Sequence, residues 1–273
     1  MDFLKKLLLA VGLLTILWTT PVMAEQLTIV TPYWGMEENT YQNDAYGLKL
    51  KDTQATMGLY LQSIDTDRYQ WNLFLYRTSD INHSDLTGAN FIYDYYFAAD
   101  AKGKNAVGVG VNYLQLDLSG KNLPLTGSPM PMPLPGFDLD LDVASLYLRA
   151  GRYFNYDSGS FQGTVFPWAG GQLDHQTGAG LADYPGPGFA AFKIIDDQSS
   201  WIAGLNFKAT YRHFLQLDAK HTVTYNHDGY YNKDTAMVNL FFNQRWGLSY
   251  RYNYQETSVG KDRYHLFGIA MVF

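Results

Sequence analysis

The chain has 273 residues, no cysteine and a net charge of −6 at neutral pH. A sequence without thiols excludes disulfides, thiolate metal sites and a cysteine nucleophile, and the acidic balance argues against nucleic acid as a partner. Aromatic residues make up 16% of the chain and charged residues 17%, with 22 tyrosines and 25 glycines. Because aromatic residues favour strands, this composition predicts a β-rich protein.

The first 24 residues have the parts of a secretory signal peptide. Lys5 and Lys6 form a basic start, residues 7–18 are apolar, and Ala24 ends a short segment suited to cleavage. We therefore expect residues 1–24 to be removed on export in a Gram-negative bacterium. Their removal takes away two lysines and one aspartate, which leaves a net charge of −7.

After the signal peptide, apolar and polar residues alternate over many segments. No later stretch approaches 18 consecutive apolar residues, the length that a transmembrane helix needs. In residues 246–255, Trp246, Leu248 and Tyr250 share one face, and Arg251 lies on the other. Such alternation, with aromatic residues near the segment ends, is typical of strands that cross an outer membrane. The sequence therefore predicts an all-β fold, a closed antiparallel transmembrane β-barrel.

The alternating segments predict about 12 strands within residues 45–273, an even number as in other bacterial barrels. The expected spans are 45–51, 55–64, 68–77, 89–99, 105–117, 139–154, 160–173, 201–212, 215–225, 235–243, 246–256 and 263–273. Because only residues 52–54 separate the first two spans, a 10-strand barrel is the alternative. Residues 25–44 are expected to form a periplasmic N-terminal segment.

The last strand carries a recognisable pattern. Phe267, Ile269, Met271 and Phe273 share one face, and Phe273 is the final residue. A terminal phenylalanine that closes an alternating apolar strand resembles the assembly signal of the porin-like superfamily of bacterial outer-membrane β-barrels. The motif covers the last ten residues and identifies no specific family. The resemblance implies outer-membrane lipid around the barrel and recognition of the last strand by the barrel assembly machinery.

The inward faces of the expected strands carry six basic and two acidic residues. These are Lys49, Asp94, Arg149, Lys208, Arg212, Asp218, Lys220 and Arg251. A basic lining attracts anions into a narrow tube. The sequence thus favours a porin-like outer-membrane channel for the passive passage of small solutes, weakly anion-favouring and monomeric. Inward aromatic residues such as Phe74 and Tyr153 leave open that side chains fill the lumen and seal the barrel, which would then serve structure or surface interactions.

One predicted hairpin has an apolar inner face and an acidic outer face near its tip. The inner residues are Leu114, Leu116, Leu118, Phe137, Leu139 and Leu141, and the outer ones Asp138, Asp140 and Asp142. We expect this hairpin to project beyond the bilayer and, with a long loop at residues 175–200, to form an apolar vestibule. An alternative function is therefore uptake of small apolar ligands. The three aspartates suit a divalent cation, but their spacing of about 7 Å along a strand is too wide for one tight site.

The sequence does not predict an enzyme. Residues 225–229 resemble the histidine segment of the outer-membrane phospholipases, but Gly229 stands where that family places its serine nucleophile. Without a nucleophile beside His227, acyl transfer has no first step. No catalytic residue and no cofactor are therefore expected.

Overall fold

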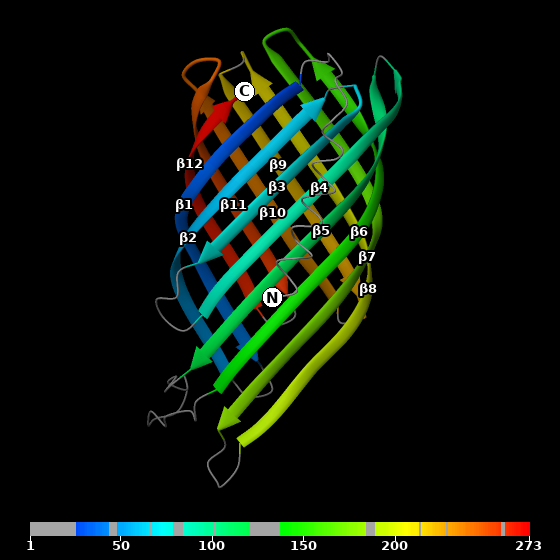
Figure 1. The fold of residues 1–273 in the computed structure, drawn as a ribbon. Helices are drawn as coiled ribbons and strands as arrows, with labels where there is room; N and C mark the ends of the chain where they lie inside the picture. Colours follow the sequence, from blue (N-terminus) through cyan, green and yellow to red (C-terminus); the bar gives the residue numbers. More distant parts are fainter. Residues whose placement is uncertain are drawn as a thin grey trace.

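The computed structural model describes residues 26–43, 48–65, 67–78, 84–100, 102–120, 137–183, 189–212, 214–227, 229–257 and 260–273. Within these residues twelve antiparallel strands pair in chain order, and β1 (Gln26–Asn43) pairs with β12 (Gly260–Val272) to close the barrel (Figure 1). Closure leaves no open sheet edge, which is the condition for a sheet to cross a bilayer. The predicted all-β barrel is confirmed. No described segment is a helix long and apolar enough to span a membrane.

The strands differ strongly in length around the barrel. The others are β2 (Leu48–Asp65), β3 (Tyr69–Thr78), β4 (Ser84–Asp100), β5 (Gly103–Gly120), β6 (Phe137–Asp157), β7 (Phe161–Asp183), β8 (Phe189–Tyr211), β9 (Leu215–Asn226), β10 (Gly229–Phe241) and β11 (Trp246–Thr257). We call β5–β8 the long wall, with strands of 18 to 23 residues, and β9–β12 the short wall, with strands of 12 or 13 residues. The long wall extends farthest at the lower end of Figure 1.

The two ends of the barrel have different connections. The widest interval between consecutive strands falls between Gly120 of β5 and Phe137 of β6, and these two residues lie at the end toward which the long wall extends. The other end carries short turns and the described chain ends, where Phe273 exchanges backbone hydrogen bonds with Thr28. Long outer loops and short periplasmic turns are the rule in such barrels. We therefore call the end with Gly120 and Phe137 the outer end.

The prediction for the first strands is wrong in detail. Residues 26–43, expected as a periplasmic segment, form β1 and pair along their whole length with β2. Residues 48–65 form one strand, so the break expected at residues 52–54 is absent from it. The strand number is confirmed because these two errors cancel. Pro32 and Gly35 disturb the alternation of β1, and its inward face carries the buried Glu37, so the strand lacks a simple apolar pattern.

The expected loop at residues 175–200 is mostly strand. β7 and β8 pair continuously from Phe161 and Tyr211 to Asp183 and Phe189. The outer parts of β7 and β8 lack the apolar alternation of lipid-facing strands, and polar residues such as His175 and Asp197 point outward there. Residues 1–24 lie outside the described part of the chain.

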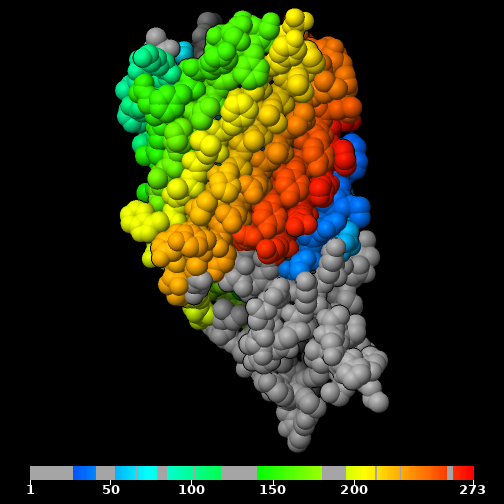
Figure 2. All heavy atoms as spheres, turned by 180° about the vertical axis from the view of Figure 1, so that it is seen from behind, coloured from blue at the N-terminus to red at the C-terminus, as the bar shows by residue number. Residues whose placement is uncertain are grey.

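The exterior carries an apolar band. Outward side chains such as Met57, Leu148 and Phe267 are each more than half exposed. Trp201 lies toward the outer boundary of this band, and Trp246 lies at the periplasmic boundary. Figure 2 shows the strands of the short wall, in yellow to red, crossing this surface obliquely. An apolar band bounded by aromatic residues matches the hydrocarbon layer of a bilayer.

The outer face of the long wall changes from apolar to acidic along its length. On β5 the exposed Val107 and Val111 are followed by Asp117, and on β6 the exposed Leu148 and Leu146 give way to Asp142 and Asp140 toward the outer end. Carboxylates do not face hydrocarbon without a large cost. The long wall therefore continues past the apolar band into the aqueous phase.

Candidate functional site

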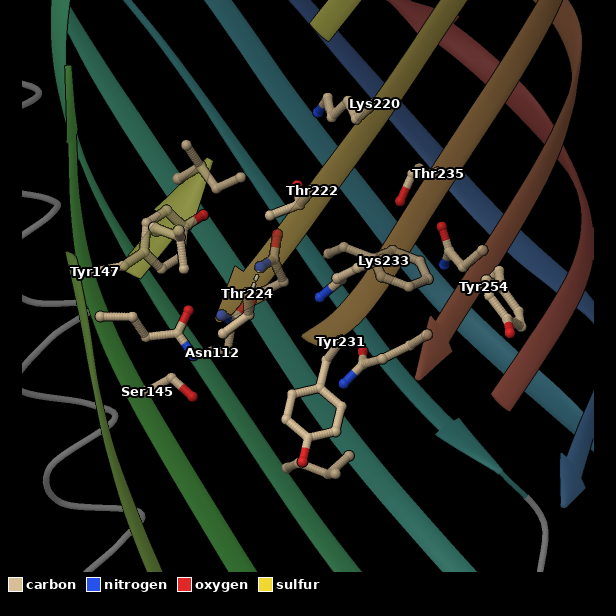
Figure 3. Close-up of a pocket in the computed structure, with 18 of the residues that line it drawn as sticks. Asn112, Ser145, Tyr147, Lys220, Thr222, Thr224, Tyr231, Lys233, Thr235 and Tyr254 are labelled. Atoms are coloured by element: carbon tan, nitrogen blue, oxygen red, sulfur yellow. Dashed lines mark hydrogen bonds between the residues drawn. The ribbon is translucent and has the colours of Figure 1, made fainter. Parts of the chain in front are cut away.

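A cavity occupies the outer half of the lumen. It has a volume of about 200 Å³ and is lined by inward side chains from both walls and from β3 and β4. On the short wall it reaches Tyr231 and Gln255, near the outer ends of β10 and β11. Figure 3 shows its two sides facing each other, with Lys220 and Lys233 on one and Asn112 and Tyr147 on the other.

One side of the cavity is cationic. Lys220 on β9, Lys233 on β10 and Arg251 on β11 belong to adjacent strands and all point inward because each lies at an inward position of its strand. Lys220 lies opposite Thr235 in the ladder, and Lys233 lies opposite Thr222. We call Lys220, Lys233 and Arg251 the cationic cluster.

The cationic cluster is poorly neutralised. Among the described residues, no carboxylate lies within ion-pair distance of Lys220 or Lys233. The charged groups that act on Lys233 are both cations, Arg251 and Lys220. Asp218 acts on Lys220 from two residues away on β9, and Glu256, which also lines the cavity, is paired with Lys261 at 3.0 Å. Arg251 lies over the ring of Phe74, 4.1 Å from its centroid, and its Nε donates to Asn253 Oδ1 at 3.2 Å. The cluster therefore leaves positive potential in the cavity.

The facing side carries an apolar patch beside polar groups such as Asn112 and Ser145. Tyr76, Leu114 and Val143 are half-buried and line the cavity, and we call these three residues the apolar side. Leu114 and Val143 are cross-strand neighbours. The Tyr76 ring lies so close to Gly88 that an added Cβ would sit 2.1 Å from Tyr76 Cζ. The missing side chain at residue 88 thus lets the ring pack beside Leu114.

The amide side chains around the apolar side are already hydrogen-bonded. Asn90 Nδ2 donates to Asn112 Oδ1, and Trp168 Nε1 donates to Asn206 Oδ1 at 3.1 Å. Gln172 Nε2 donates to Asp174 Oδ1 at 2.7 Å. These groups therefore have less capacity left for a solute than the lysines opposite them.

A second group of charges lies closer to the periplasmic end. Arg149 binds both carboxylate oxygens of the fully buried Asp94, at 2.9 and 2.7 Å. Asp94 Oδ2 also accepts hydrogen bonds from Gln70 Nε2 at 2.8 Å and from the Tyr153 hydroxyl at 3.1 Å. A bidentate pair with further donors is the arrangement that makes a buried charge tolerable.

This group reaches across the lumen. Lys208 Nζ donates to Gln70 Oε1 at 3.0 Å, and β8 and β3 lie on nearly opposite sides of the barrel. Lys208 Nζ also lies 3.8 Å from Asp218 Oδ2. The Tyr153 ring stacks on Phe166 at 4.0 Å and fills the adjacent space. We call Gln70, Asp94, Arg149, Tyr153 and Lys208 the transverse network. Arg149 also lines the cavity, and the rest of the network narrows the lumen on the periplasmic side of it.

The structure divides the predicted lining residues into separate groups. Asp94, Arg149, Lys208 and Asp218 belong to or adjoin the transverse network, and Lys220 and Arg251 belong to the cationic cluster. The assignment of Arg212 to the lumen is wrong. It follows the last residue of β8, has a φ of 47°, and lies exposed with its guanidinium 5.3 Å from the Tyr211 ring. The side chain of Lys49 lies outside the described part.

Sequence reasoning missed several inward charges. Lys233 was missed because β10 begins at Gly229 and not at residue 235. Continuing the alternation of Thr235 and Met237 back toward Tyr231 would have found it. The inner face also holds Glu37, Asp174, Asp196 and Asp262. The expected ratio of six basic to two acidic residues therefore does not describe the whole lumen, and the excess of positive charge is local to the cavity.

The residues predicted to form the vestibule lie deeper in the lumen, farther from the outer end, than expected. Leu114, Leu116 and Leu141 point inward and belong to the same cluster as Phe74 and Tyr76, and of these three leucines Leu114 lines the cavity. The side chains of Leu118, Phe137, Leu139 and Asp138 lie outside the described part. Asp140 and Asp142 are exposed, and Asp142 Oδ1 accepts a hydrogen bond from the Tyr113 hydroxyl at 2.6 Å. Within the described residues no cluster of three acidic or histidine side chains suits a metal ion.

Comparison with known proteins rests on structure. No protein-family model matches the chain, and no curated protein matches its sequence. The translocator domain of the autotransporter NalP from Neisseria meningitidis is similar over 100% of this chain and 95% of its own, with a TM-score of 0.56 and 14% identity. The fold is that of a bacterial outer-membrane β-barrel. With the apolar band on its exterior, this fold places the protein in the outer membrane.

Two further solved structures are similar at lower scores. The transport unit of the autotransporter AIDA-I from Escherichia coli has a TM-score of 0.48 and 10% identity, over 94% of each chain. The toluene transporter TodX from P. putida has a TM-score of 0.42 and 9% identity, over 92% of this chain and 90% of its own.

Proposed function

We propose that the protein is an outer-membrane channel for small solutes that weakly favours anions. The observation that supports this most directly is the cationic cluster, which faces a solute-sized cavity and whose two lysines have no described carboxylate within ion-pair distance. Cations in a narrow, low-dielectric passage lower the entry barrier for anions and raise their local concentration. A solute enters at the outer end and reaches Lys220 and Lys233 before it meets the transverse network.

Passage toward the periplasm requires movement in the transverse network. Lys208 is held by one charge-assisted hydrogen bond to Gln70, worth about 1.5–3 kcal/mol net, and by a longer contact of 3.8 Å with Asp218, and it has a long flexible stem. The bidentate pair of Arg149 and Asp94 is more strongly held. The path therefore opens on the side of Lys208, while Arg149 stays in place.

The proposal includes the surroundings of the barrel. It is a monomer enclosed by outer-membrane lipid, which contacts exposed outward side chains such as Phe267 and Ile269. Its last strand, ending at Phe273, is the element that the barrel assembly machinery recognises. No reaction is assigned to the lumen.

A sealed barrel with a structural or surface role is the second candidate. The transverse network favours it, because Asp94, Tyr153 and Phe166 are almost completely buried and fill the periplasmic half of the lumen. In that case the cavity would be a blind pocket open only to the outside.

Conductance in a planar bilayer under a KCl gradient separates the two candidates. We expect steady single-channel conductance with an anion-directed reversal potential, and the double variant Lys220→Gln with Lys233→Gln should move that potential toward zero. Lys102→Gln is the matched control, because Lys102 is exposed in the periplasmic turn between β4 and β5, does not line the cavity and should not affect selectivity. A folded barrel without conductance would overturn the channel and support the sealed barrel.

A further inference from the structure

We infer that the cavity is a binding site for a small organic anion with an apolar body, whose carboxylate lies on Lys220 and Lys233 and whose body contacts the apolar side. The inference rests on the proposed function only in that the solute arrives from the outer end. It specifies the chemical class of the solute, whereas the proposed function specifies only the charge of the solute.

The donors of this site form a compact patch on two strands. Lys220 lies opposite Thr235, and Lys233 lies opposite Thr222, so each ammonium group has a hydroxyl as its cross-strand neighbour. All four side chains line the cavity and are partly exposed to it (Figure 3). An ionised carboxylate only accepts hydrogen bonds, and ammonium and hydroxyl groups both supply donors. The patch therefore suits the two oxygens of one carboxylate.

The opposite side suits the remainder of such a solute. Leu114 and Val143 are cross-strand neighbours, and the Tyr76 ring packs beside them over Gly88. Phe74, which also lines the cavity, and Leu116 belong to the buried cluster against which Tyr76 and Leu114 pack. Because apolar area is stabilised by removal from water, at about 25 cal/mol per Å², an apolar body gains affinity there.

Other classes of solute fit less well. A neutral apolar solute would strip water from Lys220 and Lys233 without replacing their hydrogen bonds, which is costly. A small inorganic anion would leave the apolar side in contact with water. A sugar would place hydroxyl groups against Leu114 and Val143, which offer them no hydrogen bonds.

The volume of the cavity limits the size of the solute. At about 200 Å³ it lies below the range of about 300–1,000 Å³ that is usual for pockets of drug-sized ligands. One ring or a short chain with a single carboxylate fits this space. Benzoate is therefore a suitable probe. Acetate carries the same carboxylate without the ring, and benzyl alcohol carries the ring without the charge, so the two compounds test the two halves of the site separately.

The test is calorimetric titration of the purified protein in detergent with these three compounds. We expect benzoate to bind at least about tenfold more tightly than either acetate or benzyl alcohol, a difference of 1.4 kcal/mol. Lys220→Gln with Lys233→Gln should weaken benzoate binding at least about tenfold. Val143→Thr keeps the shape of the side chain and should weaken benzoate but not acetate, and Lys102→Gln, in the exposed turn between β4 and β5, should change neither.

Each contrary result has a distinct meaning. Equal binding of acetate and benzoate, or benzoate binding that survives loss of both lysines in a folded barrel, would overturn the inference. Because binding is measured without a membrane, conductance without benzoate binding would refute the site and leave the channel. Benzoate binding without conductance would support the site and refute the channel.

Discussion

The long wall and the short wall follow the same alternation of inward and outward residues, yet they use inward charge differently. On the long wall Arg149 is held by both oxygens of Asp94 and lies over Trp168, 5.0 Å from the ring centroid. On the short wall Lys220 and Lys233 point into open space, and no carboxylate in the described structure pairs with them. A paired charge in the lumen stabilises the barrel, whereas an unpaired one is available to a solute.

The outward faces of the two walls differ as well. The long wall carries an apolar band followed by exposed acidic residues such as Asp140, and it extends past the end of the short wall (Figure 1). On the short wall the lining of the cavity extends to Tyr231 and Gln255, near the outer ends of β10 and β11. Unequal walls therefore give the lumen an oblique outer rim.

The largest effect should follow from Arg149→Met. Removal of the guanidinium leaves Asp94 buried without its ion-pair partner, which costs about 3–5 kcal/mol of unfolding free energy. Urea unfolding of the barrel from lipid vesicles, followed by tryptophan fluorescence, measures the loss. Adding Asp94→Leu should recover most of it, because the stranded charge is then gone.

Arg152→Met is the control for this prediction. Arg152 also pairs with an aspartate, Asp100, but both side chains are partly exposed to water. Its loss should be far smaller, because water replaces the partner. Equal losses in the two variants would mean that burial does not distinguish the pairs.

A second prediction tests how far the long wall projects. Leu148 and Asp140 both point outward on β6, but only Leu148 lies within the apolar band. Leu148→Arg should cost about 2–4 kcal/mol of unfolding free energy in vesicles, and Asp140→Arg about 0–1 kcal/mol. The same measurement in vesicles of thicker lipid should raise the cost at residue 140 only if the bilayer then reaches it. Similar costs at both positions in ordinary lipid would contradict the projection.

The smallest effect is expected for Lys233→Met. Because its described surroundings contain no ion pair, removal of its charge should change the unfolding free energy by no more than about 0.5 kcal/mol. The comparison with Arg149→Met is the sharpest test of the two roles of inward charge. A loss of several kcal/mol at Lys233 would show that it stabilises the barrel and is not reserved for a solute.

Much of this architecture could be predicted because lipid imposes a simple pattern. Strands such as β11 and β12 show strict alternation, since one face meets hydrocarbon and the other meets the lumen. Prediction was wrong where that pattern is weak. β1 has Pro32 and an inward Glu37, and the outer part of β7 and β8 lies beyond the apolar band, so neither segment shows the expected alternation.

By itself the sequence determined that the chain is a barrel and, for most strands, which residues point inward, because the side-chain period of two is visible in the residue order. The tertiary structure alone decided which inward groups meet. Gln70 and Lys208 are 138 residues apart and join only because closure brings β3 and β8 to opposite sides of one narrow lumen. Strand register and closure likewise place Lys220 and Lys233 across from Leu114 and Val143. The alternation of residues along the sequence does not contain this arrangement.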